Sequence, residues 1–259
     1  MAVVCYPQPN KGRSRDILRR FAAGSGGRVQ FDPPARLEDG PAAFFGVVAI
    51  EYLLNEARDN GRDWYYLDNS WFDATRKVMT RVGVNALQGG AVIGPDWKRF
   101  AALNLRTEDW KRDGRHIVIC MQSPHFMREV ARWPGGAPAW QEHVLLTLKE
   151  HTDRPIVVRH WSSDKAERAH SLQEDLRGAW ALITHASAAA NEAVLAGVPA
   201  FVTGKCAALP MASGELSEIE KPRYPDGREE WAAGLAARQW TLQELQSGEA
   251  WRAICGTAG

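Results

Sequence analysis

Short, wholly apolar runs alternate with segments of helical spacing along most of this chain. The clearest runs are IVIC (117–120), IVV (156–158) and ALIT (181–184), none of which contains a charged residue. Such runs are typical of parallel strands covered on both faces, whereas half-exposed strands alternate apolar and polar residues. Strands that alternate with helices predict βαβ units. We therefore expect an α/β protein built on doubly wound parallel sheets.

The alternation forms two series that meet near residue 114. Strands are predicted over 2–6, 28–32, 42–50, 63–67, 117–120, 154–160, 181–184 and 200–204. Helices are predicted over 14–24, with Ser14 as N-cap and Gly24 as the stop, over 51–61 and 137–153, and over 227–254 with a break near 239–241. This pattern predicts two Rossmann-like domains, residues 1–113 and residues 114–259 with the terminal helices. We expect them to face a cleft, with ligands at the carboxyl ends of the strands.

Composition excludes several classes of protein. The four cysteines (Cys5, Cys120, Cys206 and Cys255) are far apart and form no CxxC pair, which argues against a zinc site or a disulfide framework. No apolar run approaches the eighteen residues of a membrane span. The N-terminus lacks the pattern of a signal peptide. We therefore expect a cytoplasmic protein without a membrane span, while the net charge of +1 indicates no particular partner and nothing indicates the oligomeric state.

The run at 180–202, WALITHASAAANEAVLAGVPAFV, predicts a strand, a loop of small residues, a short helix and a return strand. Small side chains let a ligand approach the backbone, and free amides in the first helical turn favour a phosphate. Ser187 is predicted to cap the helix or to donate its hydroxyl to the ligand. Glu192 lies one turn further and is predicted to reach a ribose diol, while Gly197 ends the helix. The alternative is a buried connecting helix with a surface glutamate.

The sequence THASAAANEAVLAGVPAF (184–201) resembles the donor-binding motif of GT-B glycosyltransferases. It is similar in particular to NSTxGxEALxxGxP of the capsule-polysaccharide transferases. The resemblance implies a nucleotide-sugar co-substrate, no other cofactor, and contacts from Ser187, Ala188 and the following amides to the diphosphate. Ala188 and Ala190 depart from the motif, because they stand where Thr and Gly are usual. The whole chain also resembles uncharacterised proteins of tailed phages, which would place it in the host cytoplasm.

Other residues of the second half fit the same donor pocket. Gln122 and Ser123 follow the strand at 117–120, where GT-B enzymes contact the donor. The resemblance also implies that a basic residue after the next strand neutralises the leaving diphosphate; the candidates there are Arg159, His160 and Lys165. For Arg159 the alternative is a surface charge at a strand end. His185 is predicted either to contact the ligand or to take part in ordinary polar packing.

Glycosyl transfer needs a base that deprotonates the acceptor hydroxyl. Asp68, placed where a predicted strand meets a loop, is our first candidate, followed by Asp16, Asp32 and Asp96. The alternative for Asp68 is an Asx-turn with Ser70, in which the carboxylate accepts a hydrogen bond within the turn. No DxD-like motif occurs in a plausible loop, so we expect no metal and a metal-independent mechanism.

The acceptor is expected on the first domain. The loop PQPNKGRS (7–14) contributes Lys11, Arg13 and Ser14, and Asn69 follows the predicted base; the alternative is an exposed turn. Residues 1–115 carry 18 Lys and Arg against 14 Asp and Glu, and the segment 76–115 carries 9 against 4. These counts predict an anionic acceptor or, alternatively, a solvated face.

Trp71, Trp97 and Trp110 lie among these charges and are predicted to stack on bases. With the phage resemblance, this favours DNA with a hydroxymethylated pyrimidine as acceptor, with the base flipped out. The alternative places the tryptophans in the core, with a saccharide or a lipid-linked acceptor. Two other classes of function remain open: a non-catalytic nucleic-acid-binding phage protein that keeps the fold, and another enzyme such as a sugar-nucleotide epimerase.

Overall fold

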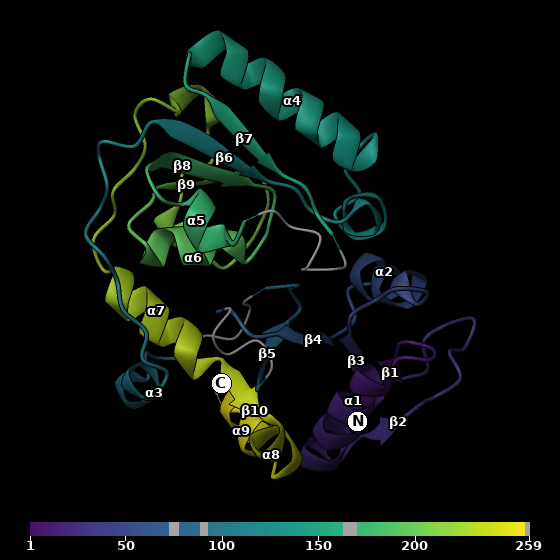
Figure 1. Cartoon of the computed structure of the whole chain (residues 1–259). Coiled ribbons are helices and arrows are strands. Elements are labelled where there is room, and N and C mark those ends of the chain that lie inside the picture. The colour runs from purple at the N-terminus through teal and green to yellow at the C-terminus, as the bar shows by residue number, and fades with distance from the viewer. Residues whose placement is uncertain (73–77, 89–92, 163–169, 257–259) are drawn as a thin grey trace. The chain divides into compact units, whose positions relative to one another are not determined.

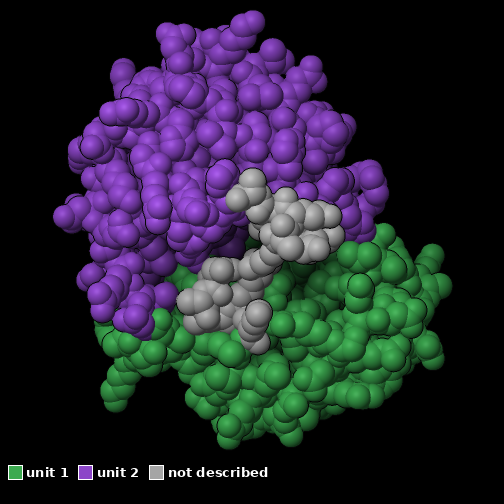
Figure 2. Space-filling model, in the orientation of Figure 1, with its two compact units in different colours: residues 1–103, 233–259 green, residues 104–232 purple. Residues whose placement is uncertain are grey.

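The computed structural model describes residues 1–72, 78–88, 93–162 and 170–256. The chain forms two compact units, coloured separately in Figure 2. Unit 1 comprises residues 1–103 and 233–259, and unit 2 comprises residues 104–232. Each unit combines a largely parallel sheet with helices (Figure 1), so the predicted α/β class is confirmed.

The described strands of unit 1 form a six-stranded sheet in the order β10-β5-β4-β3-β1-β2. Strands β1 to β4 are parallel, whereas β5 is antiparallel to β4 and β10 is antiparallel to β5. The strands are β1 (Val4–Pro7), β2 (Arg28–Val29), β3 (Ala42–Phe45), β4 (Trp64–Asn69), β5 (Met79–Val84) and β10 (Gln239–Thr241). The helices are α1 (Gly12–Ser25), α2 (Glu51–Asp59), α3 (Trp97–Ala102), α8 (Leu242–Gln246) and α9 (Glu249–Cys255), and α7 (Arg228–Ala237) crosses the boundary between the units.

The C-terminal segment belongs to unit 1, which differs from the predicted boundary between residues 113 and 114. Leu245 and Ile254 from α8 and α9 share one apolar core with Phe21 of α1 and Cys5 of β1. Helices α1 and α8 approach so closely that a Cβ on Gly24 would lie 2.0 Å from the carbonyl oxygen of Leu245. The predicted break at 239–241 is strand β10, which extends the unit 1 sheet.

Unit 2 has a four-stranded parallel sheet in the order β7-β6-β8-β9 among its described residues. The strands are β6 (His116–Cys120), β7 (Ile156–Arg159), β8 (Ala179–Thr184) and β9 (Ala200–Val202), and the helices include α4 (Gly136–His151), α5 (Leu172–Asp175) and α6 (Ala189–Leu195). Figure 1 shows α4 on one side of the sheet and α5 and α6 on the other. This is the doubly wound arrangement that the apolar runs predicted.

Helix α4 covers its face of the sheet with Trp140, Val144 and Leu148, which pack on Ile119 and Ile183 from the central strands. All five of these side chains are buried. Strands β6 and β8 are central and covered on both faces, which is why their sequences are apolar without alternation.

Two helix ends differ from the prediction. Helix α1 begins at Gly12 with Lys11 as its N-cap, so Ser14 lies inside the first turn. The helix ends at Ser25, with Gly26 in the left-handed conformation (φ 68°) as its C-cap, rather than at Gly24. Gly26 can adopt this conformation without strain because it has no Cβ.

Candidate functional site

The strand order of unit 2 creates a topological switch between β6 and β8. The chain leaves β6 toward β7 on one side and returns to β8 on the other. In doubly wound sheets the loops after two such strands diverge, and ligands bind at this point. The strand ends are tied together there, because Thr184 donates a hydrogen bond of 2.8 Å from its hydroxyl to the carbonyl oxygen of Cys120. We call this end of the sheet the carboxyl edge of unit 2.

The motif residues predicted to bind a donor lie at this edge. Gln122 and Ser123 follow β6, while His185 and Ser187 follow β8. Both serine hydroxyls accept local hydrogen bonds, Ser123 from the amide of Phe126 at 3.1 Å and Ser187 from the amide of Ala189 at 3.2 Å. A serine hydroxyl that accepts one hydrogen bond can still donate its own proton. The fold thus brings together the two segments that the sequence singled out.

The start of α6 differs in detail from the prediction. Its N-cap is Ala188 rather than Ser187, although the Ser187 hydroxyl does bond the Ala189 amide. The amides of Ala190 and Asn191 bond to the carbonyl oxygens of Ser187 and Ala188 at 3.2 and 2.9 Å. These first-turn amides are therefore engaged within the chain, and fewer face a ligand than the motif suggested.

The other end of α6 follows the prediction. The helix ends just before Gly197, which has a φ of 69°. A Cβ at this position would lie 2.0 Å from the carbonyl oxygen of Asp109, so the glycine also permits close packing of a neighbouring loop. Glu192 is half-buried in the helix.

His185 lies in a mostly apolar environment at the carboxyl edge. Its Nδ1 is 2.9 Å from the hydroxyl of Thr203, and its ring centroid is 5.5 Å from that of Trp133 and 6.5 Å from that of Phe126. Burial lowers the pKa of His185 below its ordinary value, so the neutral imidazole is favoured. Sequence reasoning missed Thr203. The signal that could have found it is its position directly after the apolar run AFV, at the end of β9.

Arg159 is held by an acidic partner. Its guanidinium forms an ion pair with Asp175 of α5 and also donates to the carbonyl oxygen of His170 at 2.8 Å. The side chains of Arg159 and Asp175 are 13% and 10% exposed, so the pair is largely buried. His160 is exposed, and Lys165 lies outside the described residues. The predicted diphosphate contact of Arg159 would have to coexist with this ion pair.

In unit 1 the corresponding switch lies between β1 and β3. The hydroxyl of Ser14 accepts from the amide of Gln8 and donates to the carbonyl oxygen of Phe45, both at 3.0 Å. The side chain of Gln8 donates to the same carbonyl at 2.9 Å. Ser14 is only 1% exposed. The predicted acceptor contact of Ser14 is thus replaced by a structural role, because its hydroxyl ties α1 to the ends of β1 and β3.

Arg13 and Asn69 come together at the same end of the unit 1 sheet. Arg13 donates to Oδ1 of Asn69 at 3.0 Å, and its guanidinium is 5.9 Å from the ring of Phe45. Arg13 and Lys11 are exposed, while Asn69 is half-buried. Two residues that are far apart in the sequence and were both predicted to bind the acceptor are therefore neighbours.

Asp68 lies within β4 rather than at its end, since the strand continues to Asn69. Its Oδ2 accepts a hydrogen bond of 2.7 Å from Arg81 on β5, and its Oδ1 accepts one of 2.7 Å from the amide of Asn69. The Ser70 hydroxyl donates to the carbonyl oxygen of Phe72 rather than to Asp68. The carboxylate of the predicted base is thus held in an ion pair between adjacent strands.

The weaker candidates for the base have other structural roles or surroundings. Asp16 pairs with Arg20 at 3.1 Å on the surface of α1. Asp96 is the N-cap of α3 and accepts from the amide of Arg99 at 2.9 Å. Asp32 is exposed.

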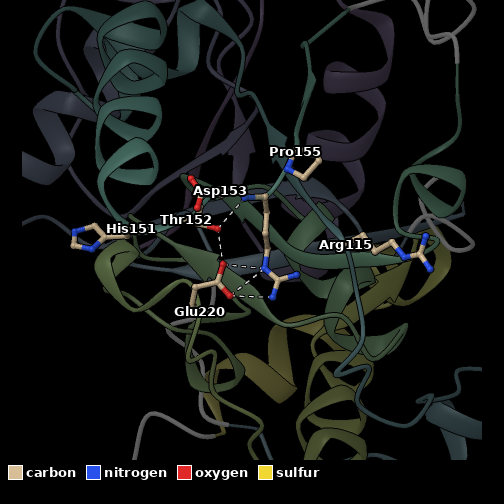
Figure 3. Close-up of a pocket in the computed structure, with 7 residues that line it drawn as sticks. Arg115, His151, Thr152, Asp153, Pro155 and Glu220 are labelled. Carbon is tan, nitrogen blue, oxygen red and sulfur yellow. Dashed lines mark hydrogen bonds and ion pairs between the residues drawn. The ribbon is translucent and has the colours of Figure 1, made fainter.

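Unit 2 also has an open pocket at the opposite edge of its sheet, before β6 and β7 (Figure 3). Arg154 spans it, donating to Glu220 at 2.9 Å and to the carbonyl oxygen of Gly114 at 2.7 Å, with its guanidinium 3.8 Å from the Trp180 ring. The hydrogen bonds from Arg154 lower the pKa of Glu220. Arg154 and Glu220 of this pocket are paired with each other, and the pocket contains none of the predicted donor residues.

Two solved structures of KpsC from Thermosulfurimonas dismutans share the architecture of this chain. The beta Kdo 2,4 transferase matches with a TM-score of 0.52 and 13% identity, over 93% of this chain and 92% of that one. The beta Kdo 2,7 transferase matches with a TM-score of 0.54 and 11% identity, over 96% and 99%. The fold is GT-B-like. No family model matches the sequence, and no curated protein matches it.

The prediction that three tryptophans stack on bases is wrong for Trp71. Trp71 is fully buried, with the guanidinium of Arg81 4.6 Å from its ring. Trp110 donates to the carbonyl oxygen of Pro225 at 3.1 Å and lies under Arg228 at 4.1 Å. Trp97, by contrast, is 50% exposed.

Several cations of the basic segment are neutralised within the fold. Three of them form ion pairs: Arg81 with Asp68, Arg99 with Glu244 and Lys111 with Glu108. Arg76 lies outside the described residues. The positive excess in the sequence therefore overstates the charge available to an anionic polymer.

Within the described residues, no group of three or more His, Cys, Asp or Glu side chains is arranged to hold a metal ion. In the same part of the chain, no helix combines the length and apolarity that crossing a membrane requires.

Proposed function

We propose that this protein transfers a sugar from a nucleotide-activated donor to a saccharide or lipid-linked acceptor, with the donor bound at the carboxyl edge of unit 2. The observation that carries this proposal is the coincidence of motif and topology. The run that resembles a donor motif on sequence alone follows β8, one of the two strands that flank the topological switch. Ligands of doubly wound sheets bind at such points.

The donor contacts follow from the side chains at this edge. Ser123 and Ser187 each have a hydroxyl proton to donate to a phosphate oxygen, and Glu192 would accept hydrogen bonds from a ribose diol. Gln122 lies beside Ser123 and can either donate or accept. The GT-B-like fold supports this assignment, since both similar structures are named as sugar transferases.

We place the acceptor on unit 1, at the end of the sheet where Arg13 and Asn69 meet. Asp68 lies beside Asn69 and is the proposed base. Its ion pair with Arg81 orients the carboxylate.

A saccharide acceptor agrees better with the surface of the protein than DNA does. The buried Trp71 cannot stack on bases without unfolding its surroundings, and paired arginines attract phosphates weakly. The hydroxymethylated pyrimidine stays a prediction, and incorporation of sugar into hydroxymethylated DNA tests it directly.

Calorimetric titration with CMP-, UDP- and GDP-sugars tests the proposal, beginning with an activated Kdo because both similar structures are Kdo transferases. A donor that binds in the micromolar range and loses its sugar to an added saccharide would support transfer. Interconversion of the sugar while it stays on the nucleotide would indicate an epimerase instead. Absence of binding to every donor, combined with salt-dependent binding to DNA, would favour the non-catalytic alternative.

A further inference from the structure

A chain of hydrogen bonds runs from the core of unit 2 to His185. The indole Nε1 of Trp140, on α4, donates to the hydroxyl oxygen of Thr203 at 2.8 Å. The same hydroxyl oxygen is 2.9 Å from Nδ1 of His185. Trp140 is fully buried, so its end of the chain is fixed by packing.

The direction of the first hydrogen bond follows from the chemistry of the indole. An indole N–H can only donate, so the Thr203 oxygen is the acceptor in the first bond. In the second bond the roles depend on the tautomer of His185: the Thr203 hydroxyl donates to Nδ1 when that nitrogen carries no proton, and accepts from it when it does. A neutral imidazole that accepts at one nitrogen carries its proton on the other. When the Thr203 oxygen that accepts from Trp140 donates its own proton to Nδ1, His185 presents Nε2–H as a hydrogen-bond donor.

The backbone around His185 is built to hold the ring in place. Gly204 leaves room for the ring, since a Cβ there would lie 2.6 Å from both Cε1 and Nε2. The other side is packed by Phe126, which begins the π-helical turn Phe126–Val130, and by Trp133, which follows Arg132 with a left-handed φ of 54°. Both π turns and left-handed non-glycine residues are unfavourable and are enriched at functional sites.

We propose that Thr203 and Trp140 are positioning residues that fix His185 in the Nε2–H tautomer, so that it donates a hydrogen bond to a phosphate oxygen of the nucleotide donor. The ligand part of this inference rests on the proposed function, whereas the tautomer does not. The neutral donor recognises an anionic oxygen through hydrogen bonding rather than through charge. It also favours departure of the nucleotide, because the bond strengthens as negative charge develops on that oxygen.

The tautomer is measured first, on the ligand-free protein labelled with ¹⁵N. Long-range proton–nitrogen spectra at pH 7.5 distinguish the two ring nitrogens, and the His185→Phe variant identifies the His185 signals among the seven histidines. We expect an unprotonated Nδ1 and a protonated Nε2. Thr203→Val and Trp140→Phe should shift the protein toward a mixture of tautomers, and Thr203→Ser should restore the wild-type pattern. A protonated Nδ1 in wild type would overturn the proposal.

Binding of CMP, UDP and GDP is then measured by calorimetry. For whichever of them binds, His185→Phe and Thr203→Val are expected to weaken affinity about tenfold, since each removes or misorients one charge-assisted hydrogen bond. His185→Gln, whose amide nitrogen occupies nearly the position of Nε2, should recover part of the loss. Thr107→Val is the matched control, because Thr107 bonds to Glu229 and not to His185.

The two parts of the inference can fail separately. Equal affinity of wild type and His185→Phe would overturn the phosphate contact, even with the Nε2–H tautomer established. If wild type binds none of the three nucleotides, the proposed function and this contact are both overturned. The spectra would still decide the tautomer.

Discussion

Arg81 donates a hydrogen bond of 2.7 Å to Oδ2 of Asp68 across strands β5 and β4. The Arg81 side chain is 8% exposed and that of Asp68 is 30% exposed, so the ion pair lies at the boundary between core and solvent. A residue chosen from the sequence as a base is therefore also a structural partner. These two roles can be separated by experiment.

Asp68→Asn is expected to lower the rate of transfer by about 10²–10⁴ while leaving donor affinity unchanged. The asparagine keeps an oxygen that can accept from Arg81, so we expect the unfolding free energy to fall by less than about 2 kcal/mol. Asp68→Ala removes both functions and should show a larger loss of stability. Steady-state kinetics with chemical denaturation check both variants. Full activity of the folded Asn variant would exclude Asp68 as the base.

Glu192→Ala is expected to weaken nucleotide binding by about 1.5–3 kcal/mol, or roughly tenfold to a hundredfold, with the fold intact. The reason is the loss of a charged acceptor for the ribose diol. Calorimetry with the nucleotide that binds wild type measures the effect. Glu215→Ala, at an exposed position outside α6, serves as control. Unchanged affinity in the Glu192 variant would contradict the donor site.

Arg159 and Asp175 form a largely buried ion pair, so removing either partner leaves a charge without its counterpart. Single alanine variants are each expected to destabilise the protein by up to about 3 kcal/mol, and the double variant by less than their sum. If Arg159 also contacts the diphosphate, nucleotide affinity falls in Arg159→Ala and in the double variant but is kept in Asp175→Ala. Similar affinity in all three variants would leave Arg159 with its structural role alone.

The lowered pKa of His185 predicts a pH dependence of stability. Below about pH 6.5, the unfolded chain binds a proton at this position more readily than the folded protein does. The unfolding free energy should therefore fall between pH 7.5 and 5.5. The lowered pKa of Glu220 contributes stability that is lost only below about pH 4.5, outside this window. Urea unfolding at three pH values checks this, and the slope should be smaller in His185→Gln.

Gly24→Ala tests the attachment of the C-terminal helices to unit 1. Alanine normally stabilises a helix relative to glycine by about 1 kcal/mol. Here the new Cβ would lie 2.0 Å from the Leu245 carbonyl oxygen and 2.8 Å from the Gly248 nitrogen, so we expect destabilisation by about 1–3 kcal/mol. Gly12→Ala, in the same helix with nothing within 4 Å of its Cβ, should be neutral or stabilising. Thermal unfolding compares the two variants, and equal behaviour would contradict the close packing.

The sequence by itself determined the α/β class, most strands and the segments that meet at the carboxyl edge of unit 2. These features are local: the apolar runs IVIC and ALIT reflect strands covered on both faces, and Gly197 marks a helix end through its own backbone conformation. For the same reason the sequence predicted that the C-terminal helical segment is interrupted at 239–241. It did not predict that the interruption is strand β10.

The tertiary structure decided what depends on partners far along the chain. The C-terminal helices pack on α1 because their apolar faces complete its core, and no local pattern records this preference. Likewise, Arg81 forms an ion pair with Asp68, and Asp175 forms one with Arg159. Thr203 contacts His185 only because strand order places the end of β9 beside that of β8. Sequence periodicity reports which face of an element is buried, whereas the identity of the neighbour that buries it is set by the packing of the whole unit.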